Sequence, residues 1–315
     1  MKPKLNIGLA LGSGSSRGWS HIGVIRAFTE MGIAPNIVCG TSIGALVGGA
    51  YSTNSLDKLE GWACSLTKFE TLKFLDINAS RSGLVNTEKF RRFLVEHLAG
   101  DEAMIEELGK RYAAVSTDLE NGREEWLTKG SIVDAVLASL SLPGLFSPVR
   151  NRDRWLVDGG LVNPVPVSVC RALGADVVIA VNLNGDIVGK HSDKRVAKLK
   201  SKTESETEIK TGDGAGARLG SLVKDYTSSW FPDAENKMQA PSIFEAIASS
   251  INITQDRITR SRLAGDPPDI LITPKLAHIG LLEFYRAQEA IEEGKVSTRR
   301  MQEEIFDALG MARVP

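Results

Sequence analysis

The sequence has few of the residues that bind metals or form disulfide bonds. It contains 3 cysteines and 4 histidines in 315 residues. Cys39, Cys64 and Cys170 are odd in number, widely spaced and set in apolar contexts, which is typical of reduced core residues in a cytosolic protein. No group of His, Cys and acidic residues has the spacing of a metal site. We therefore expect no metal and no other cofactor.

The sequence also lacks an excess of charge of either sign. The 38 Lys and Arg residues balance 39 Asp and Glu residues, which gives a net charge of −1. A net charge near zero gives no indication of a nucleic acid as partner. A chain of this length can bury a large core in one domain or two.

Uninterrupted apolar runs long enough for a membrane span are missing. Residues 31–56 carry no charge, but Pro35 and several glycines interrupt them and argue against a span. Lys2 and Lys4 precede an apolar run that has no small-residue cleavage site. We therefore expect residues 1–12 to contain a buried strand and not a signal peptide.

A glycine-rich loop follows the first expected strand, residues 6–11, and precedes a helix expected over residues 20–31. The loop reads Gly12-Ser13-Gly14-Ser15-Ser16-Arg17-Gly18. Such a loop forms a nest of backbone N–H groups that suits an anion. A dinucleotide-binding loop would need glycine where Arg17 stands, and the phosphate-binding motif of nucleoside triphosphatases is absent. The candidate that fits is the oxyanion of an acyl-transfer intermediate.

The next informative stretch places a serine between two glycines. An expected strand at residues 37–39 leads into Gly40-Thr41-Ser42-Ile43-Gly44, and a helix of small residues follows. This is the pattern of a nucleophile elbow, in which a serine on a sharp turn exposes its hydroxyl. Gly40 and Gly44 leave room for a close backbone approach. We expect Ser42 to be a nucleophile; the alternative is a tight turn without a catalytic role.

An acidic residue ends a later apolar strand, at residues 155–158. Asp158 is followed by Gly159 and Gly160. An aspartate at the end of a strand, where flexible backbone begins, is well placed to act as a base. The alternative is an ordinary Asp-Gly turn.

Hydrophobic periodicity and turn signals predict the remaining elements. A hairpin turn is expected at residues 121–122, a helix cap at Ser131, and a packing role for His97. Loop 141–148 is expected to line a pocket or to cover the core. The expected helices lie at residues 55–65, 87–98, 132–140, 165–173 and 242–263, the expected strands at 111–119, 124–127, 176–183 and 269–273, and the closing helices at 282–309.

The composition changes at residues 186–241. This stretch is polar and rich in lysine, and it contains the aromatic run Trp230-Phe231-Pro232. We interpret it as an insert into the fold. A solvated surface loop is the favoured interpretation, and the alternative is a lid or a segment that touches anionic lipid at the inner face of a membrane.

Three motifs together resemble those of the patatin-like phospholipase family. They are residues 9–23, 40–44 and 158–160, and the resemblance is closest to small bacterial members related to the catalytic domain of neuropathy target esterase. The motif-bearing core covers residues 5–185, and residues 265–269 also look like that subgroup. The resemblance implies a single domain over residues 1–315, with a three-layer α/β/α fold, a mainly parallel central sheet, and closing helices and a strand at 242–315.

The resemblance also implies roles for individual residues. Ser42 matches the nucleophile and Asp158 its partner in a catalytic dyad. The oxyanion loop corresponds to Gly12, Ser13, Gly14, Ser15, Ser16 and Arg17, and the N–H donors are expected from about Gly14 to Ser16. The family loop usually reads G-G-G-x-R-G, so serine stands here at two glycine positions; the N–H groups remain, but a position that needs positive φ is strained. The implied activity is hydrolysis of a lipid or simpler ester, of the phospholipase A, lysophospholipase or carboxylesterase type.

Two rival interpretations stay open. The order Ser42, Asp158, His278 also matches the triad of α/β-hydrolases, although that fold places its serine after several strands and Ser42 follows the second. We expect His21 to have a structural role. The second rival is a catalytically silent lipid-binding or regulatory protein that keeps the fold. Headgroup preference, acyl-chain preference and oligomeric state are left undetermined.

Overall fold

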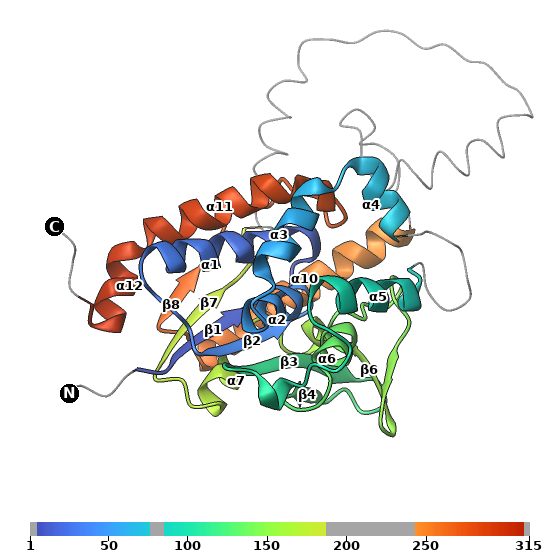
Figure 1. Cartoon of the computed structure of the whole chain (residues 1–315), viewed down its shortest axis with the longest axis horizontal. Coiled ribbons are helices and arrows are strands. Elements are labelled where there is room, and N and C mark those ends of the chain that lie inside the picture. Colours follow the sequence, from blue (N-terminus) through green and yellow to red (C-terminus); the bar gives the residue numbers. More distant parts are fainter. Residues whose placement is uncertain (1–4, 76–84, 187–242, 312–315) are drawn as a thin grey trace, which may run out of the picture.

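The structure is a computed structural model that describes residues 5–75, 85–186 and 243–311 (Figure 1). The proposed insert at residues 186–241, with its aromatic run and candidate lid, lies outside the described residues apart from Asp186. The expectation of one domain over the full chain stays a prediction.

An 8-stranded sheet forms the centre of the structure, in the order β5-β6-β3-β2-β1-β7-β8, with β4 paired to β3. Neighbouring strands from β3 through β2, β1 and β7 to β8 are parallel, while β4 and β6 pair antiparallel with β3 and β5 pairs antiparallel with β6. The strands are β1 (Ile7–Leu11), β2 (Ile37–Thr41), β3 (Arg111–Asp118), β4 (Glu124–Leu127), β5 (Val149–Asn151), β6 (Arg154–Asp158), β7 (Val177–Val181) and β8 (Ile270–Ile272).

Helices cover both faces of the sheet, which confirms the predicted α/β class (Figure 1). The helices are α1 (Ser20–Glu30), α2 (Ile43–Ser52), α3 (Leu56–Ser65), α4 (Lys68–Leu75), α5 (Thr87–His97), α6 (Ile132–Ser139), α7 (Val167–Ala172), α10 (Ile243–Gly265), α11 (Ala287–Arg300) and α12 (Gln302–Leu309). Short 3₁₀ turns occur at Ser15–Trp19, Ile105–Glu107, Gly159–Leu161 and Phe284–Arg286.

Side chains that point alternately to the two faces of the sheet explain why there are two hydrophobic cores. In β1, Leu9 and Leu11 point into the larger core beneath α1, α2 and α11, while Ala10 points into the smaller core beside α7. Successive side chains of a strand face opposite sides, so a strand buried on both faces is apolar throughout. This is why β1, β2 and β7 read as continuous apolar runs in the sequence.

The structure corrects one prediction about the cysteines. Cys39 and Cys170 are fully buried in the smaller core, as expected, but Cys64 is exposed on α3. Leu59 and Ala63 are the inward-facing residues of that helix. The side chain one position after Ala63 therefore points away from the core, because neighbouring helical residues lie about 100° apart. An apolar sequence context did not predict burial here.

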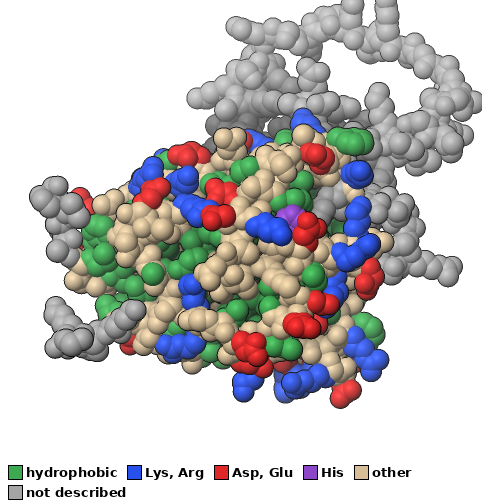
Figure 2. Space-filling model, viewed as in Figure 1, with side chains coloured by type: hydrophobic (Ala, Val, Ile, Leu, Met, Phe, Trp, Pro, Cys, Tyr) green, Lys and Arg blue, Asp and Glu red, His purple; other side chains and the backbone are tan. Residues whose placement is uncertain are grey.

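Charged side chains of both signs are mixed over the face seen in Figure 2, for the part of the chain that is described. On that same part, no helix is both long enough and apolar enough to cross a membrane.

Candidate active site

Ser42 lies on the sharp turn between β2 and α2. Its backbone has φ 57° and ψ −124°, an unusual conformation for a residue with a side chain. Its N–H donates to Ser139 Oγ at 2.8 Å, and Ser139 Oγ donates to the carbonyl of Val115 on β3 at 2.6 Å. Ser139, which sequence reasoning did not single out, therefore holds the strained turn against the central sheet.

The two glycines of the turn are required by its geometry. A Cβ atom on Gly40 would lie 2.3 Å from the carbonyl oxygen of Gly44, and a Cβ on Gly44 would lie 2.1 Å from that of Leu11. Both distances are far below van der Waals contact. The expectation that these positions permit a close backbone approach is confirmed.

Sheet register brings Asp158 to the same edge as Ser42. Thr41 on β2 pairs with Val115 on β3, and the next residue of β3, Ser116, pairs with Asp158 on β6. Ser42 and Asp158 therefore flank β3 at one level, about two strand spacings apart. Thr117 Oγ1 donates to the Asp158 carbonyl at 2.9 Å, which fixes the end of β6.

The side chains of these two residues meet directly. Ser42 Oγ donates to Asp158 Oδ2 at 2.5 Å, and Gly160 N–H donates to Asp158 Oδ1 at 2.7 Å. Asp158 is 1 % exposed, and burial raises its pKa to about 6 although both hydrogen bonds favour the charged form. A carboxylate with such a pKa is a competent base near neutral pH.

The glycine-rich loop offers fewer free amides than the sequence suggested. The N–H groups of Gly12, Ser13, Ser16 and Arg17 donate to the carbonyls of Val181, Pro164, Leu281 and Gly14 respectively. Within the described residues, the N–H groups of Gly14 and Ser15 have no acceptor. Both residues line the same pocket as Ser42. Of the predicted donors, Ser16 is wrong, because its N–H bonds the Leu281 carbonyl, while the N–H groups of Gly14 and Ser15 remain candidates.

The N–H groups of Gly14 and Ser15 share their peptides with the carbonyls of Ser13 and Gly14, and other residues contact both carbonyls. Arg17 donates to the Gly14 carbonyl from its backbone N–H at 3.3 Å and from Nε at 3.2 Å. Asn184 Nδ2 lies 3.5 Å from the Ser13 carbonyl, a long contact. In a trans peptide the C=O and the following N–H point in opposite directions. Fixing these carbonyls therefore orients the Ser15 and Gly14 N–H groups.

Ser15 shows the strain expected of serine at a glycine position. Its φ is 53°, in the left-handed region that glycine adopts freely. Such a conformation costs on the order of 1 kcal/mol or more. The Ser15 hydroxyl offsets part of this cost, because it donates to the Leu281 carbonyl at 2.6 Å. Ser16 Oγ donates to the neighbouring Gly280 carbonyl at 2.7 Å and braces the loop in the same place.

Among the residues that the structure describes, no histidine completes a triad with Ser42 and Asp158. His278 is half-exposed and pairs with Glu289 at 2.8 Å, and it is not among the residues that line the pocket. His21 bonds through Nε2 to the Gly12 carbonyl at 2.8 Å, and burial lowers its pKa to about 4. The predicted structural role of His21 is confirmed. His97 stacks on Phe93, as its predicted packing role requires.

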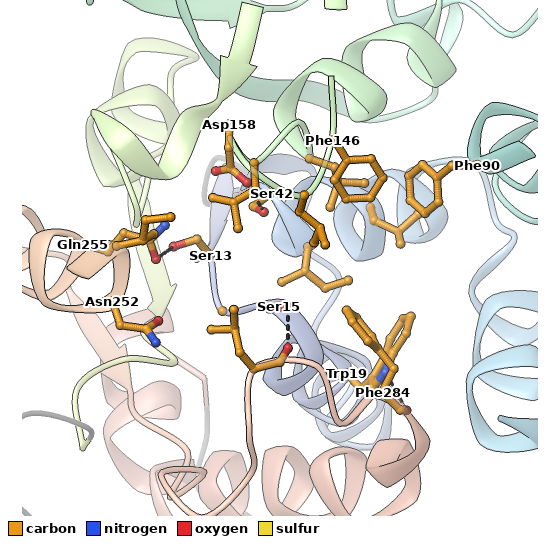
Figure 3. A pocket seen from close by; sticks show the side chains of 18 of the residues that line it. Ser13, Ser15, Trp19, Ser42, Phe90, Phe146, Asp158, Asn252, Gln255 and Phe284 are labelled. Carbon is orange, nitrogen blue, oxygen red and sulfur yellow. Dashed lines mark hydrogen bonds between the residues drawn. The ribbon is translucent and has the colours of Figure 1, made fainter. Parts of the chain in front are cut away.

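An apolar pocket opens beside the Ser42 hydroxyl (Figure 3). One wall comes from loop 141–148, through Leu142, Leu145 and Phe146, which confirms that this loop lines a pocket. Aromatic side chains line much of the remainder: Trp19, Trp62, Phe90, Phe93 and Phe284. The pocket thus offers a surface for a hydrocarbon chain next to a nucleophile.

The polar corner of the pocket is smaller and comes from different elements. Ser13 and Ser15 belong to the glycine-rich loop, and Asn252 and Gln255 belong to α10 (Figure 3). Sequence reasoning missed both α10 residues, since a lone amide on a long helix carries no motif. Among the described residues, no group of three or more His, Cys, Asp and Glu could hold a metal.

One family model and several known proteins resemble this chain. The family model described as patatin-like phospholipase matches residues 9–171. An uncharacterized NTE family protein of Mycobacterium bovis is 33 % identical over 92 % of this chain and 89 % of its own length. The chain belongs to the patatin-like phospholipase family. The matched region contains the glycine-rich loop, Ser42 and Asp158.

Other relatives of this patatin-like protein are much longer than this chain. The lysophospholipase NTE1 of Pyricularia oryzae is 28 % identical over 92 % of this chain, which spans 18 % of that fungal protein. A patatin-like phospholipase domain-containing protein of Caenorhabditis elegans is 36 % identical over 56 % of this chain and 13 % of its own length. Membership of the family implies that the protein is a lipid acyl hydrolase.

Proposed function

We propose that this patatin-like protein hydrolyses carboxylic esters of lipids with a Ser42–Asp158 dyad and without a histidine. The observation that carries the proposal is the 2.5 Å hydrogen bond from Ser42 Oγ to Asp158 Oδ2. It supports direct proton transfer, because a base must lie within hydrogen-bond reach of the proton that it accepts. The apolar pocket next to Ser42 supports an acyl chain as the bound group.

In the first half of the proposed reaction, Asp158 accepts the hydroxyl proton while Ser42 Oγ attacks the ester carbonyl carbon. The carbonyl oxygen becomes an oxyanion, which the Gly14 and Ser15 N–H groups stabilise. Protonated Asp158 then gives its proton to the leaving alcohol oxygen. The C–O bond breaks, the alcohol departs, and the acyl group stays on Ser42.

In the second half, a water molecule replaces the alcohol. Asp158 accepts a proton from the water as its oxygen attacks the acyl-enzyme. The same two amides stabilise the second oxyanion. Collapse of this intermediate returns the proton from Asp158 to Ser42 Oγ and releases the carboxylic acid. Phospholipid, lysophospholipid and simpler esters all contain the bond that these steps cleave.

The proposal is tested by covalent labelling of the folded protein with a fluorophosphonate probe. We expect the probe to label wild-type protein at Ser42, because phosphonylation needs an activated serine and an oxyanion site. Labelling is expected to disappear in Ser42→Ala and to persist in His278→Ala. Intact-mass spectrometry after the reaction measures how much probe is attached to each of the three proteins. An unlabelled, folded wild-type protein supports the silent binding protein, and loss of labelling in His278→Ala supports the triad.

The raised pKa of Asp158 predicts how activity depends on pH. The base works only when ionised, so kcat/KM for a neutral ester is expected to rise with pH and to level off above an apparent pKa near 6. Below that pKa the rate should fall about tenfold per pH unit. Discontinuous measurement of released acid between pH 4.5 and 8.5 checks this. A limb near pH 4, the ordinary value for an aspartate, would contradict the assignment.

A further inference from the structure

The oxyanion loop is held by a residue outside the region that the family model matches. Gln255 lies on α10 and is 6 % exposed, and the matched region ends at residue 171. Its Oε1 accepts from Ser13 Oγ at 3.0 Å and from Asn184 Nδ2 at 3.3 Å. Figure 3 shows Gln255 facing Ser13 at the polar corner of the pocket. One buried amide oxygen thus organises two donors beside the loop.

The two donors, Ser13 Oγ and Asn184 Nδ2, both lie beside the peptide that carries the Gly14 N–H. Ser13 is the residue immediately before Gly14, and its carbonyl belongs to the same peptide as that N–H. Asn184 Nδ2 lies 3.5 Å from the Ser13 carbonyl and bonds the Gln255 oxygen as well. Gln255 therefore holds the Ser13 side chain directly and the Ser13 carbonyl through Asn184. Together with the bond from Ser13 N–H to the Pro164 carbonyl, these contacts orient the peptide that carries the Gly14 N–H.

The other end of the same side chain contacts the turn that carries the base. A Cβ atom on Gly160 would lie 2.3 Å from Gln255 Nε2 and 2.9 Å from Asp158 Oδ1. The Gln255 amide nitrogen and the Asp158 carboxylate therefore both lie close to Gly160. Gln255 thus bonds to the loop with its amide oxygen and lies beside the turn after Asp158 with its amide nitrogen.

We propose that Gln255 is a positioning residue of the oxyanion hole, acting through Ser13. This inference rests on the proposed hydrolytic function. The family loop has glycine where this chain has Ser13, so a loop of the usual sequence has no hydroxyl to offer. The serine at this position makes catalysis depend on α10. Gln255 touches neither the substrate carbonyl nor Ser42 Oγ in this role.

The test is a double-mutant cycle on ester hydrolysis with Gln255→Met and Ser13→Ala. Methionine has nearly the volume of glutamine and accepts no strong hydrogen bond, and alanine removes only the Ser13 hydroxyl. We expect each single variant to lower kcat by about 10- to 100-fold, as a small misplacement of a catalytic group does. KM is expected to stay within about threefold, because the donors act on the transition state.

The coupling between the two changes separates positioning from general damage to the fold. The double variant should lose no more kcat than the worse single variant, since both changes remove the same Ser13–Gln255 hydrogen bond. Losses that multiply, or a kcat of Gln255→Met within about threefold of wild type, would overturn the proposal. If Gln255→Met does not fold, Ser13→Ala alone decides. A loss of kcat at unchanged KM supports the proposal, and an unchanged kcat overturns it.

A matched control and the parent activity keep the two proposals apart. Thr254 is the exposed neighbour of Gln255 on α10, and Thr254→Ala is expected to keep kcat within about twofold of wild type. Wild-type hydrolysis that requires Ser42 but is indifferent to Gln255 defeats this inference alone. A wild-type protein whose hydrolysis is unaffected by Ser42→Ala defeats the proposed function itself.

Discussion

Replacing Ser42 with alanine is expected to lower kcat for ester hydrolysis by at least about 10⁴-fold. The change removes the one oxygen that can carry the acyl group in the proposed reaction, and Asp158 then has no hydroxyl proton to accept. The pocket, the Gly14 and Ser15 amides and the fold should remain, because the Ser42 backbone is held through Ser139. KM or the Kd of a non-hydrolysable lipid analogue should therefore change little.

The measurement is steady-state hydrolysis of a short-chain ester with purified protein, with thermal unfolding as a check on folding. Ser65→Ala serves as a matched control, because Ser65 is exposed on α3 and its hydroxyl bonds the Trp62 carbonyl of its own helix. We expect that variant to retain wild-type kcat. Residual hydrolysis in Ser42→Ala within about tenfold of wild type would mean that another group performs the chemistry.

Much of the site could be predicted because its parts are short, local patterns. The turn at Ser42 needs glycine on both sides for steric reasons, so the G-x-S-x-G pattern itself predicts the turn. The end of β6 at Asp158 followed by two glycines is equally local. The parallel strands were predicted because burial on both faces makes them apolar throughout.

The sequence does not predict which backbone N–H groups of the glycine-rich loop find an acceptor within the fold. Ser16 N–H is satisfied by the Leu281 carbonyl, and Gly12 N–H by that of Val181. These partners lie far away in the chain, so no local pattern shows that the Ser16 N–H is already bonded while those of Gly14 and Ser15 are not. Gln255 was missed for the same reason. Tertiary contacts, and not spacing, select the oxyanion donors.

One missed element did leave a readable signal. Helix α4 begins with a capping box in which Glu70 N–H donates to Thr67 Oγ1 and Thr67 N–H donates to Glu70 Oε2, at 3.2 and 2.8 Å. The pattern T-x-x-E marks such a start. Strand β5 left none, because its 3 residues pair with β6 without any apolar alternation.

Asn in place of Asp158 is expected to abolish most activity and to stabilise the fold. We expect kcat to fall by about 10³- to 10⁴-fold, because an amide accepts no proton from Ser42. The two hydrogen bonds can persist, since Asn Oδ1 can accept from Gly160 N–H while Nδ2 donates to Ser42 Oγ. Combined with Ser42→Ala, the change should cause little further loss, because the two residues act as a unit.

The gain in stability follows from the sign of the pKa shift. Burial raises the pKa of Asp158 from 3.8 to about 6, so the folded protein binds this proton more tightly than the unfolded chain does. The contribution of this carboxyl to the free energy of unfolding therefore falls as pH rises from about 4 to 6, and it stays low above pH 6. The shift corresponds to a cost on the order of 3 kcal/mol for burying the ionised form.

Asparagine carries no charge at any of these pH values and escapes that cost. Chemical denaturation should thus find Asp158→Asn more stable than wild type at pH 8, by up to about 3 kcal/mol, and nearly equal to it at pH 4. The matched comparison is Asp153→Asn, at an exposed aspartate near the same hairpin, which is expected to change the free energy of unfolding by less than about 0.5 kcal/mol. Equal stability of wild type and Asp158→Asn at both pH values would show that the buried carboxylate is not held at a raised pKa. A base kept reactive by burial must destabilise the fold that buries it, so loss of activity and gain of stability are expected together in this one substitution.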